Sequence, residues 1–234
     1  LGAHTVPPEY ENDRAGYLAL IQDEMIPCVA EENLAEFCDA FVEDSAFSSD
    51  EARALFDTAR KHNLRPKLHA DQLTDTGGAA LAAEVNAASA DHLECISEDG
   101  ITALANSDTV AVSLPLATLY LDEFPLPARA LREAGVPVAV ATDFNPGTAP
   151  SYHLPLAMML ACTLQRMTPA EALAGATRTA AQALDRADRL GSLAPGMRAD
   201  FALIDAPSLN HWLYHFRPNA VTKTFARGKL IASP

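Results

Sequence analysis

Short apolar segments alternate along the chain with longer amphipathic ones, and polar residues close most of the apolar segments. This pattern predicts β-strands that are each followed by a helix. Because parallel strands need a helical crossover, the alternation is typical of α/β proteins. The predicted strand ends are residues 1–4, 40–43, 66–69, 88–92, 109–114 and 137–143.

The intervening segments carry the start and stop signals of helices. Two capping boxes predict helix starts, and a proline and a glycine bracket a third helix. These signals are Ser48 with Glu51 before a helix over 50–62, Pro127 with Gly135 around a second, and Thr168 with Glu171 before a helix reaching about residue 187.

The pattern changes after Gly191 to short strands and turns. Strands are predicted near 200–204, 220–225 and 229–232, with no helical periodicity between them. The sequence therefore predicts two domains: a helix and strand domain over residues 1–190 and a small β-rich domain over residues 191–234.

The α/β part lacks the glycine-rich turn G-x-G-x-x-G after any predicted strand. This argues against an open dinucleotide-binding sheet and favours a closed TIM-like (β/α)8 barrel. Six βα units leave two sheet edges unpaired, so we expect an incomplete barrel with two further units before Leu1. The start without Met agrees with that expectation.

Charge and cysteine content narrow the possible partners. The net charge is −14, from 17 basic and 31 acidic residues, which disfavours binding to nucleic acid or anionic lipid. No apolar run approaches the length of a membrane span, which is about 20 residues. The four cysteines form no C-x-x-C pair, so we expect small buried thiols in the reducing cytoplasm.

Four predicted strand ends carry residues suited to metal or proton chemistry: His4, His69, His92 and Asp143. In barrel enzymes the carboxyl ends of the strands converge on one pocket. A neutral imidazole is a common metal ligand, and a carboxylate can bind the ion and take a proton from its water. His69 and His92 end successive strands, so they are expected to lie side by side.

Each of these residues also has a structural interpretation. A single histidine at a strand end is often a hydrogen-bonded structural residue, and Asp143 could cap the following turn. Four such residues at matching positions favour a metal-dependent hydrolase over four independent structural roles. The remaining histidines are interpreted as a helix C-terminus (His62), a weak pocket candidate (His153) and surface or packing residues (His211 and His215).

Several motifs together resemble the imidazolonepropionase family of the amidohydrolase superfamily. They are LGAHTVPPEY at 1–10, LHADQ at 68–72, SADHLE at 89–94 and ATDFNPGT at 141–148. The run GSLAPGMRADF at 191–201 resembles the return to a small β-sandwich domain in that superfamily. The resemblance spans nearly the whole chain.

The resemblance implies one divalent or trivalent metal ion, zinc or iron, with His69 and Asp143 as ligands. Two further ligands are expected from a His-x-His motif on the first strand. That motif does not occur in the chain, which agrees with the two barrel units expected before Leu1.

The resemblance also implies an activity and its residues. Water activated by the metal would hydrolyse the cyclic amide of 4-imidazolone-5-propanoate to N-formimidoyl-L-glutamate, a step of histidine degradation, in a cytoplasmic homodimer. The implied catalytic residues are Asp143 as general base, His92 at the substrate carbonyl and Gln72; the implied substrate-binding residues are His4, Gln72, His92, Asn145, Gly147 and Thr148.

Gln72 departs from the family pattern, because many relatives have an acidic residue three positions after the metal histidine. A carboxamide cannot take a proton, so Gln72 would act by hydrogen bonding. Two alternatives stay open: a related cyclic-amide hydrolase or deaminase acting on another ring, and a non-catalytic fragment of the enzyme.

Overall fold

The computed structural model describes residues 2–216 and 220–233. It contains a five-stranded sheet of order β1-β2-β3-β4-β5 and a three-stranded antiparallel sheet, β6-β7-β8. The described chain divides into two compact units, Leu1–Ala111 with Glu133–Val136, and Val112–Arg132 with Pro137–Pro234.

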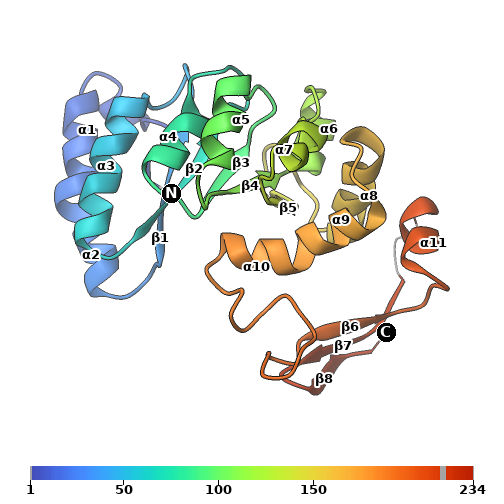
Figure 1. Cartoon of the computed structure of the whole chain (residues 1–234). Helices are drawn as coiled ribbons and strands as arrows, with labels where there is room; N and C mark the ends of the chain where they lie inside the picture. Colours follow the sequence, from blue (N-terminus) through green and yellow to red (C-terminus); the bar gives the residue numbers. More distant parts are fainter. Residues whose placement is uncertain (1, 217–219, 234) are drawn as a thin grey trace. The chain divides into compact units, whose positions relative to one another are not determined.

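The first unit is built from parallel strands and the helices between them (Figure 1). Its strands are β1 (Phe37–Val42), β2 (Arg65–Ala70), β3 (Ser89–His92) and the first half of β4 (Val110–Ser113), and its helices are α1 (Arg14–Leu20), α2 (Ile26–Glu31), α3 (Ser49–Lys61), α4 (Gly78–Glu84) and α5 (Glu98–Ala105). A short 3-10 helix precedes α1, and one π-helical turn joins α1 to α2.

Alternation along the strands gives the first unit one apolar face. In β2, Pro66, Leu68 and Ala70 are buried while the residues between them are partly exposed. Helix α3 packs against β1 and β2, and α4 packs against β2 and β3. Successive side chains of a strand point to opposite faces, so the buried residues form a core with these helices.

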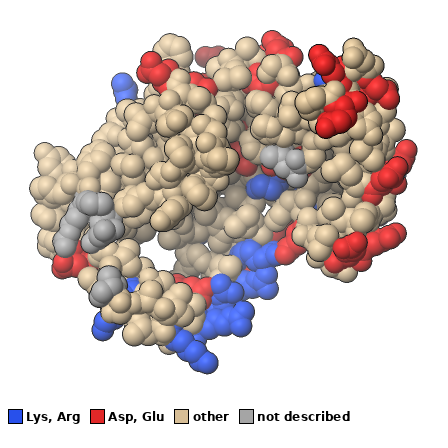
Figure 2. Space-filling view, turned by 180° about the vertical axis from the view of Figure 1, so that it is seen from behind, with Lys and Arg blue, Asp and Glu red and all other residues tan. Residues whose placement is uncertain are grey.

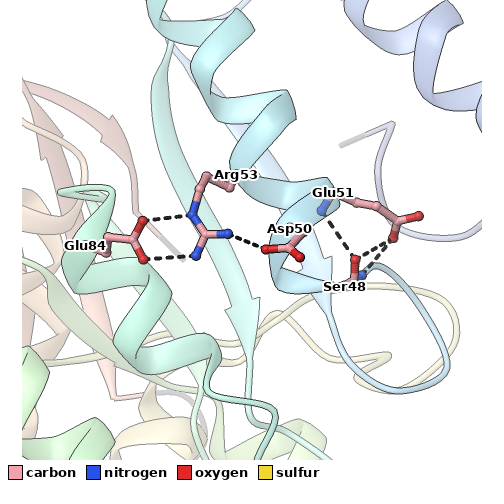
Figure 3. A network of polar contacts seen from close by, with 5 residues as sticks. All are labelled: Ser48, Asp50, Glu51, Arg53 and Glu84. Carbon is pink, nitrogen blue, oxygen red and sulfur yellow. Dashed lines mark hydrogen bonds and ion pairs between the residues drawn. The ribbon is translucent and has the colours of Figure 1, made fainter.

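Polar contacts at the helix ends reinforce this packing. Ser48 and Glu51 form the capping box predicted for α3 (Figure 3). Arg53 of α3 pairs with Asp50 in its own first turn and with Glu84 at the end of α4. One guanidinium therefore links the two helices that cover the sheet (Figure 3).

The second unit contains β5 and the C-terminal sheet, with helices before and between them. Its elements are α6 (Pro115–Leu121), α7 (Ala128–Glu133), β5 (Val138–Val140), α8 (Leu154–Leu164), α9 (Pro169–Ala174), α10 (Ala180–Ala183), β6 (Phe201–Ile204), α11 (Leu209–Tyr214), β7 (Val221–Ala226) and β8 (Lys229–Ala232). The capping box predicted at Thr168 and Glu171 is present at the start of α9.

Four sequence predictions differ from the structure. Residues 1–4 form no strand: Ala3 makes one parallel bridge to Ala40, and Leu1 lies outside the described residues. The helix expected to reach residue 187 ends at Ala183 and contains a π-helical turn over Gly175–Thr179. The tail includes a helix, α11, because Ser208 caps it by accepting from the amide of His211. Cys28 is exposed, and Cys38, Cys95 and Cys162 are only partly buried, whereas all four were expected to be buried.

Charge is unevenly distributed along the sequence. Residues 176–234 carry eight Lys and Arg against four Asp and Glu, whereas residues 1–175 carry nine against 27. On the face drawn in Figure 2, several basic side chains lie close together in the lower half and others lie singly, whereas most acidic ones lie along the upper and right-hand edges. None of the described helices has both the length and the hydropathy to cross a bilayer.

Candidate metal and substrate site

The sheet face of β1, β2 and β3 that lies opposite the buried core carries polar side chains. The register pairs Phe41 with His69, and His69 with Asp91, so these three residues share one face. The residues on this face of the three strands are Phe37, Asp39, Phe41, Arg65, Lys67, His69, Ser89 and Asp91.

His69 lies near the carboxyl end of β2, and a carboxylate of the neighbouring strand contacts its ring. Its Nδ1 lies 3.1 Å from Oδ1 of Asp39 in the neighbouring strand β1. Both side chains are 18% exposed. If Nδ1 carries the proton of the neutral ring, the lone pair belongs to Nε2, which is the form that binds a metal.

His92 ends β3 in an unusual backbone conformation. Its φ is +80° and that of Leu93 is +71°, a region that residues other than glycine rarely adopt. Continued strand alternation would place His92 on the face of Ala70, its register partner. Instead, its ring centroid lies 5.5 Å from that of His69. Such strain is concentrated at functional sites, because the surrounding structure must hold it.

A buried carboxylate accompanies His92. Nδ1 of His92 lies 3.6 Å from Oε2 of Glu94, and the two side chains are 4% and 1% exposed. Among the described residues, Nδ1 of His92 has no hydrogen-bond partner. Because Nδ1 faces the Glu94 carboxylate, a ligand would bind this ring through Nε2.

His4 completes a group of three imidazoles in the first unit. Its ring stacks on Phe41 at 5.3 Å and meets His69 edge to face at 6.3 Å between centroids. The sequence placed all three histidines at strand ends. The structure brings their rings together, although residues 1–4 are not a strand.

Gln72 lies in the loop between β2 and α4, and this loop is held at both ends. Glu43, which follows β1, is 3% exposed and accepts hydrogen bonds from the amides of Leu73 and Thr74 at 2.8 and 3.2 Å. The amide and thiol of Cys95 donate to the carbonyls of Asp71 and Gln72, respectively. Gln72 is itself only 9% exposed.

Asp71 fixes the other end of the loop. Its buried carboxylate accepts from the amides of Thr76, Gly78 and Ala79, the last two of which begin α4. Burial raises the pKa of the Asp71 carboxyl, and the hydrogen bonds from these amides oppose that shift.

The second unit contains the predicted substrate loop. Asp143 has a φ of +54°, and Asn145 organises the residues after it. The Asn145 side chain donates to the carbonyl of Asp143 at 2.7 Å and accepts from the amides of Gly147 and Thr148 at 2.9 and 2.7 Å. Phe144 and Tyr152 pack edge to face at 5.5 Å and are mostly exposed.

The other histidines have structural positions. His62 is the C-cap of α3, as its sequence position indicated. Nδ1 of His153 accepts from the amide of Leu156 and caps α8. His211 and His215 lie one helical turn apart at α11, with ring centroids 4.2 Å apart.

Sequence reasoning missed four carboxylates near the imidazoles and the Gln72 loop: Asp39, Glu43, Asp71 and Glu94. Two of them carried a signal. Asp39 interrupts the apolar residues of β1, and Glu43 closes the predicted strand 40–43 as His69 closes the predicted strand 66–69. The partners of Asp71 and Glu94 depend on loop conformation, which periodicity does not predict.

Residues 40–231 match the amidohydrolase family. The chain belongs to this family. It is 46% identical over 231 residues to an imidazolonepropionase of Shouchella clausii, covering 99% of this chain and 52% of that protein. It is 49% identical to one of Cupriavidus taiwanensis, covering 99% and 56%. The chain thus spans about half the length of the curated relatives it matches.

Solved amidohydrolase-like structures show the same fold at lower identity. A zinc-bound adenosine deaminase of Xanthomonas campestris matches with a TM-score of 0.77 at 20% identity, over 97% of this chain and 59% of that one. A 5-methylcytosine deaminase of Klebsiella pneumoniae matches with a TM-score of 0.76 at 18% identity, over 94% and 60%.

The donors of the first unit fit a metal of the kind that family members hold. Ligand atoms of Asp39, His69 and Asp91 lie within 4.8 Å of one another, as do those of His69 and His92. Imidazole nitrogen with carboxylate oxygen is the donor set that zinc and iron share in proteins. His92 adds a buried imidazole beside this set.

Proposed function

We propose that the chain is the part of an imidazolonepropionase that carries its substrate-facing histidines. It would hydrolyse the cyclic amide of 4-imidazolone-5-propanoate to N-formimidoyl-L-glutamate. The observation that supports this best is the group of His4, His69 and His92 in one unit of a chain that resembles these enzymes over its whole length. The chain spans about half the length of each relative, so the activity of the whole enzyme is proposed for it.

The fold assignment within this proposal is an incomplete TIM-like (β/α)8 barrel over residues 1–190 with part of a small β-sandwich over 191–234. The parallel pairing of β1, β2 and β3 and the helices that follow each of them support the barrel. The antiparallel β6-β7-β8 sheet supports the second domain.

The proposed metal ligands in this chain are His69 and Asp143, with zinc or iron as the ion. When bound, the ion would act as a Lewis acid that makes water nucleophilic near neutral pH. Hydrogen bonding of Nδ1 to Asp39 supports the role of His69. The position of Asp143 after the apolar strand β5 supports its role, because residues there lie at the carboxyl end of a parallel strand.

The remaining residues would bind substrate and move protons. Asp143 accepts the proton of the attacking water and returns it to the leaving ring nitrogen. His92 donates to the carbonyl oxygen, and His4 contacts the ring. Gln72 aligns the substrate by hydrogen bonding, because its carboxamide cannot exchange a proton.

The loop after Asp143 would hold the propionate of the substrate. Asn145, Gly147 and Thr148 would reach the propionate from this loop by exchanging hydrogen bonds that they make to one another for bonds to the substrate. The hydrogen bonds within the loop support this role because they fix its backbone before substrate arrives. The homodimer is a further prediction from the resemblance, and the cytoplasmic location is a prediction from the cysteine pattern.

The test is turnover of 4-imidazolone-5-propanoate by the purified full-length protein, with N-formimidoyl-glutamate quantified by mass spectrometry. His92→Asn should lower kcat by about 10²-fold or more, the range of general acid-base effects. His62→Asn is the matched control, because His62 is the C-cap of α3 and precedes the amino end of β2, whereas His92 lies at the carboxyl end of β3. This control should leave kcat near the wild-type value.

Two results would contradict the proposal. Turnover of another cyclic amide or of an aminated ring, without turnover of the imidazolone, would assign the protein to a different amidohydrolase activity. Loss of all metal on dialysis, with no turnover after zinc or iron is restored, would identify a non-catalytic protein.

A further inference from the structure

We infer that Asp39 is a positioning residue for His69, which sets the tautomer and orientation of that ring for metal binding. The inference rests on the proposed function, because it takes His69 as a metal ligand. Asp39 lies on β1, the strand next to that of His69. Asp91 of β3 lies on the same sheet face, and the inference gives this second carboxylate a different role.

The geometry places Asp39 at Nδ1 of the His69 ring, whereas the metal would bind at Nε2. Phe41 is the register partner of His69, and Asp39 lies two residues earlier on the same face of β1. From there its Oδ1 reaches Nδ1 of His69 at 3.1 Å. Diagonal neighbours of this kind lie close enough for long side chains to interact across strands.

The chemistry of this contact selects one tautomer. A carboxylate is an acceptor only, so Nδ1 of His69 must carry the proton that it donates. In the neutral ring, Nε2 then holds the lone pair. A carboxylate behind a metal-bound histidine fixes the ring and raises its basicity, and losing such a partner typically costs 10–100-fold in metal affinity.

Asp39 and Asp91 could instead be direct ligands, since their oxygens and a nitrogen of His69 lie within 4.8 Å of one another. Their partners argue for separate roles. Oδ1 of Asp91 lies 2.6 Å from the hydroxyl of Ser89, which also receives a hydrogen bond from the ammonium of Lys67.

Asp91 is therefore part of a Lys67-Ser89-Asp91 chain that compensates its charge. For Asp39, the hydrogen-bond partner among the described residues is His69. With 18% of its side chain exposed, the Asp39 carboxylate depends on that bond and holds the ring in return.

The test measures Zn²⁺ affinity of the purified full-length protein by competition with a chelating indicator. Asp39→Ala should weaken zinc binding by about 10–100-fold. Asp39→Asn keeps the size and one acceptor oxygen, so its affinity should fall between those of the wild type and Asp39→Ala. Asp91→Ala is the matched control on the neighbouring strand, and its affinity should stay close to wild type.

A second readout follows the ring itself. Long-range ¹H–¹⁵N spectra of the zinc-free protein should show His69 as the Nδ1-protonated tautomer in the wild type and as a mixture of tautomers in Asp39→Ala. The spectra are compared only between proteins that melt cooperatively, because an unfolded chain would also show a mixture of tautomers. If Asp39→Ala does not melt cooperatively, the His69 tautomer is measured in Asp39→Asn instead.

Three outcomes would overturn the inference. Wild-type zinc affinity in both Asp39 variants would show that the carboxylate does not act through His69. Equal losses in Asp39→Ala and Asp91→Ala would make both residues ligands of one cluster. If the wild type binds neither zinc nor iron, the proposed function fails together with the inference, whereas the first two outcomes leave the proposed function intact.

Discussion

Glu43 holds Thr74 through both polar groups of that residue. Oε1 of Glu43 accepts from the Thr74 amide at 3.2 Å, and Oε2 lies 2.6 Å from the Thr74 hydroxyl. The same carboxylate accepts from the amide of Leu73 at 2.8 Å. A single buried side chain at the end of β1 therefore fixes the loop after β2, which contains Gln72.

Glu43→Ala should destabilise the protein by about 1–3 kcal/mol, because it leaves two part-buried backbone amides and the Thr74 hydroxyl without their acceptor. It should also raise KM for the substrate, since Gln72 loses the support of its neighbours. Chemical denaturation measures the first effect and steady-state kinetics the second.

The matched control for this change is Asp44→Ala, one residue later and exposed, which should shift stability by less than about 0.5 kcal/mol. Equal stability of Glu43→Ala and the wild type would show that the loop does not depend on Glu43.

Gly78, the first residue of α4, allows the helix to approach β2. A Cβ at this position would lie 2.7 Å from Cβ of Ala70 and 3.2 Å from its Cα. Gly78→Ala should therefore cost about 1–3 kcal/mol of stability through overpacking, measured as a lower midpoint of thermal or denaturant unfolding.

Gly147→Ala provides the contrast. A Cβ there would meet only Oδ1 of Asn145, at an ordinary contact distance of 3.4 Å. Stability should change by less than about 0.5 kcal/mol, while KM should rise if the backbone of Gly147 approaches the substrate. A stability loss equal to that of Gly78→Ala would contradict this distinction.

The elements of the fold were largely predictable because they depend on local signals. The capping box at Ser48 fixed the start of α3, and the alternation of buried residues marked β2. The helix after Thr168 was extended too far, because Asp185 has a φ of +53° just after the helix ends at Ala183, and the sequence does not show that conformation.

The candidate site was predictable only in part. His69 and His92 stood out because each follows an apolar strand, and their rings do lie side by side. The positive φ of His92 and Leu93 gives no sequence signal, since neither residue favours that conformation. In the sequence, Asp39 and Glu94 look like ordinary solvent-exposed acids. Their contacts with His69 and His92 become visible only in the folded chain.

Gln72 provides a separate prediction, because it stands where relatives are expected to have an acid. Gln72→Ala should lower kcat/KM by about tenfold, the loss of one substrate hydrogen bond. Gln72→Glu keeps the shape and adds a titratable group, so its kcat should acquire a new dependence on pH. Unchanged kcat/KM in Gln72→Ala would remove this residue from the site.

The pair of Arg14 and Glu51 should make stability depend on pH under acid conditions. Both guanidinium nitrogens Nε and Nη2 of Arg14 reach the carboxylate, at 2.6 and 2.7 Å. Hydrogen bonding from Arg14 is the largest cause that lowers the pKa of Glu51 to about 2, against the opposing effect of burial. A carboxyl whose pKa is lower in the folded state contributes stability above its ordinary pKa, near 4.5, and loses it as the pH falls towards 2.

Because Arg14 is 43% exposed, solvent screening limits the contribution of the pair to about 1 kcal/mol. A double-mutant cycle of Arg14→Ala and Glu51→Gln, measured by denaturant unfolding, should therefore give a coupling of about that size at pH 7 and a smaller one at pH 3. The cycle cancels the separate hydrogen bonds of Glu51 to Ser48 and of Arg14 to the carbonyl of Ala46. A coupling that is the same at both pH values would mean that Glu51 does not titrate in this range and that its pKa is not set by Arg14.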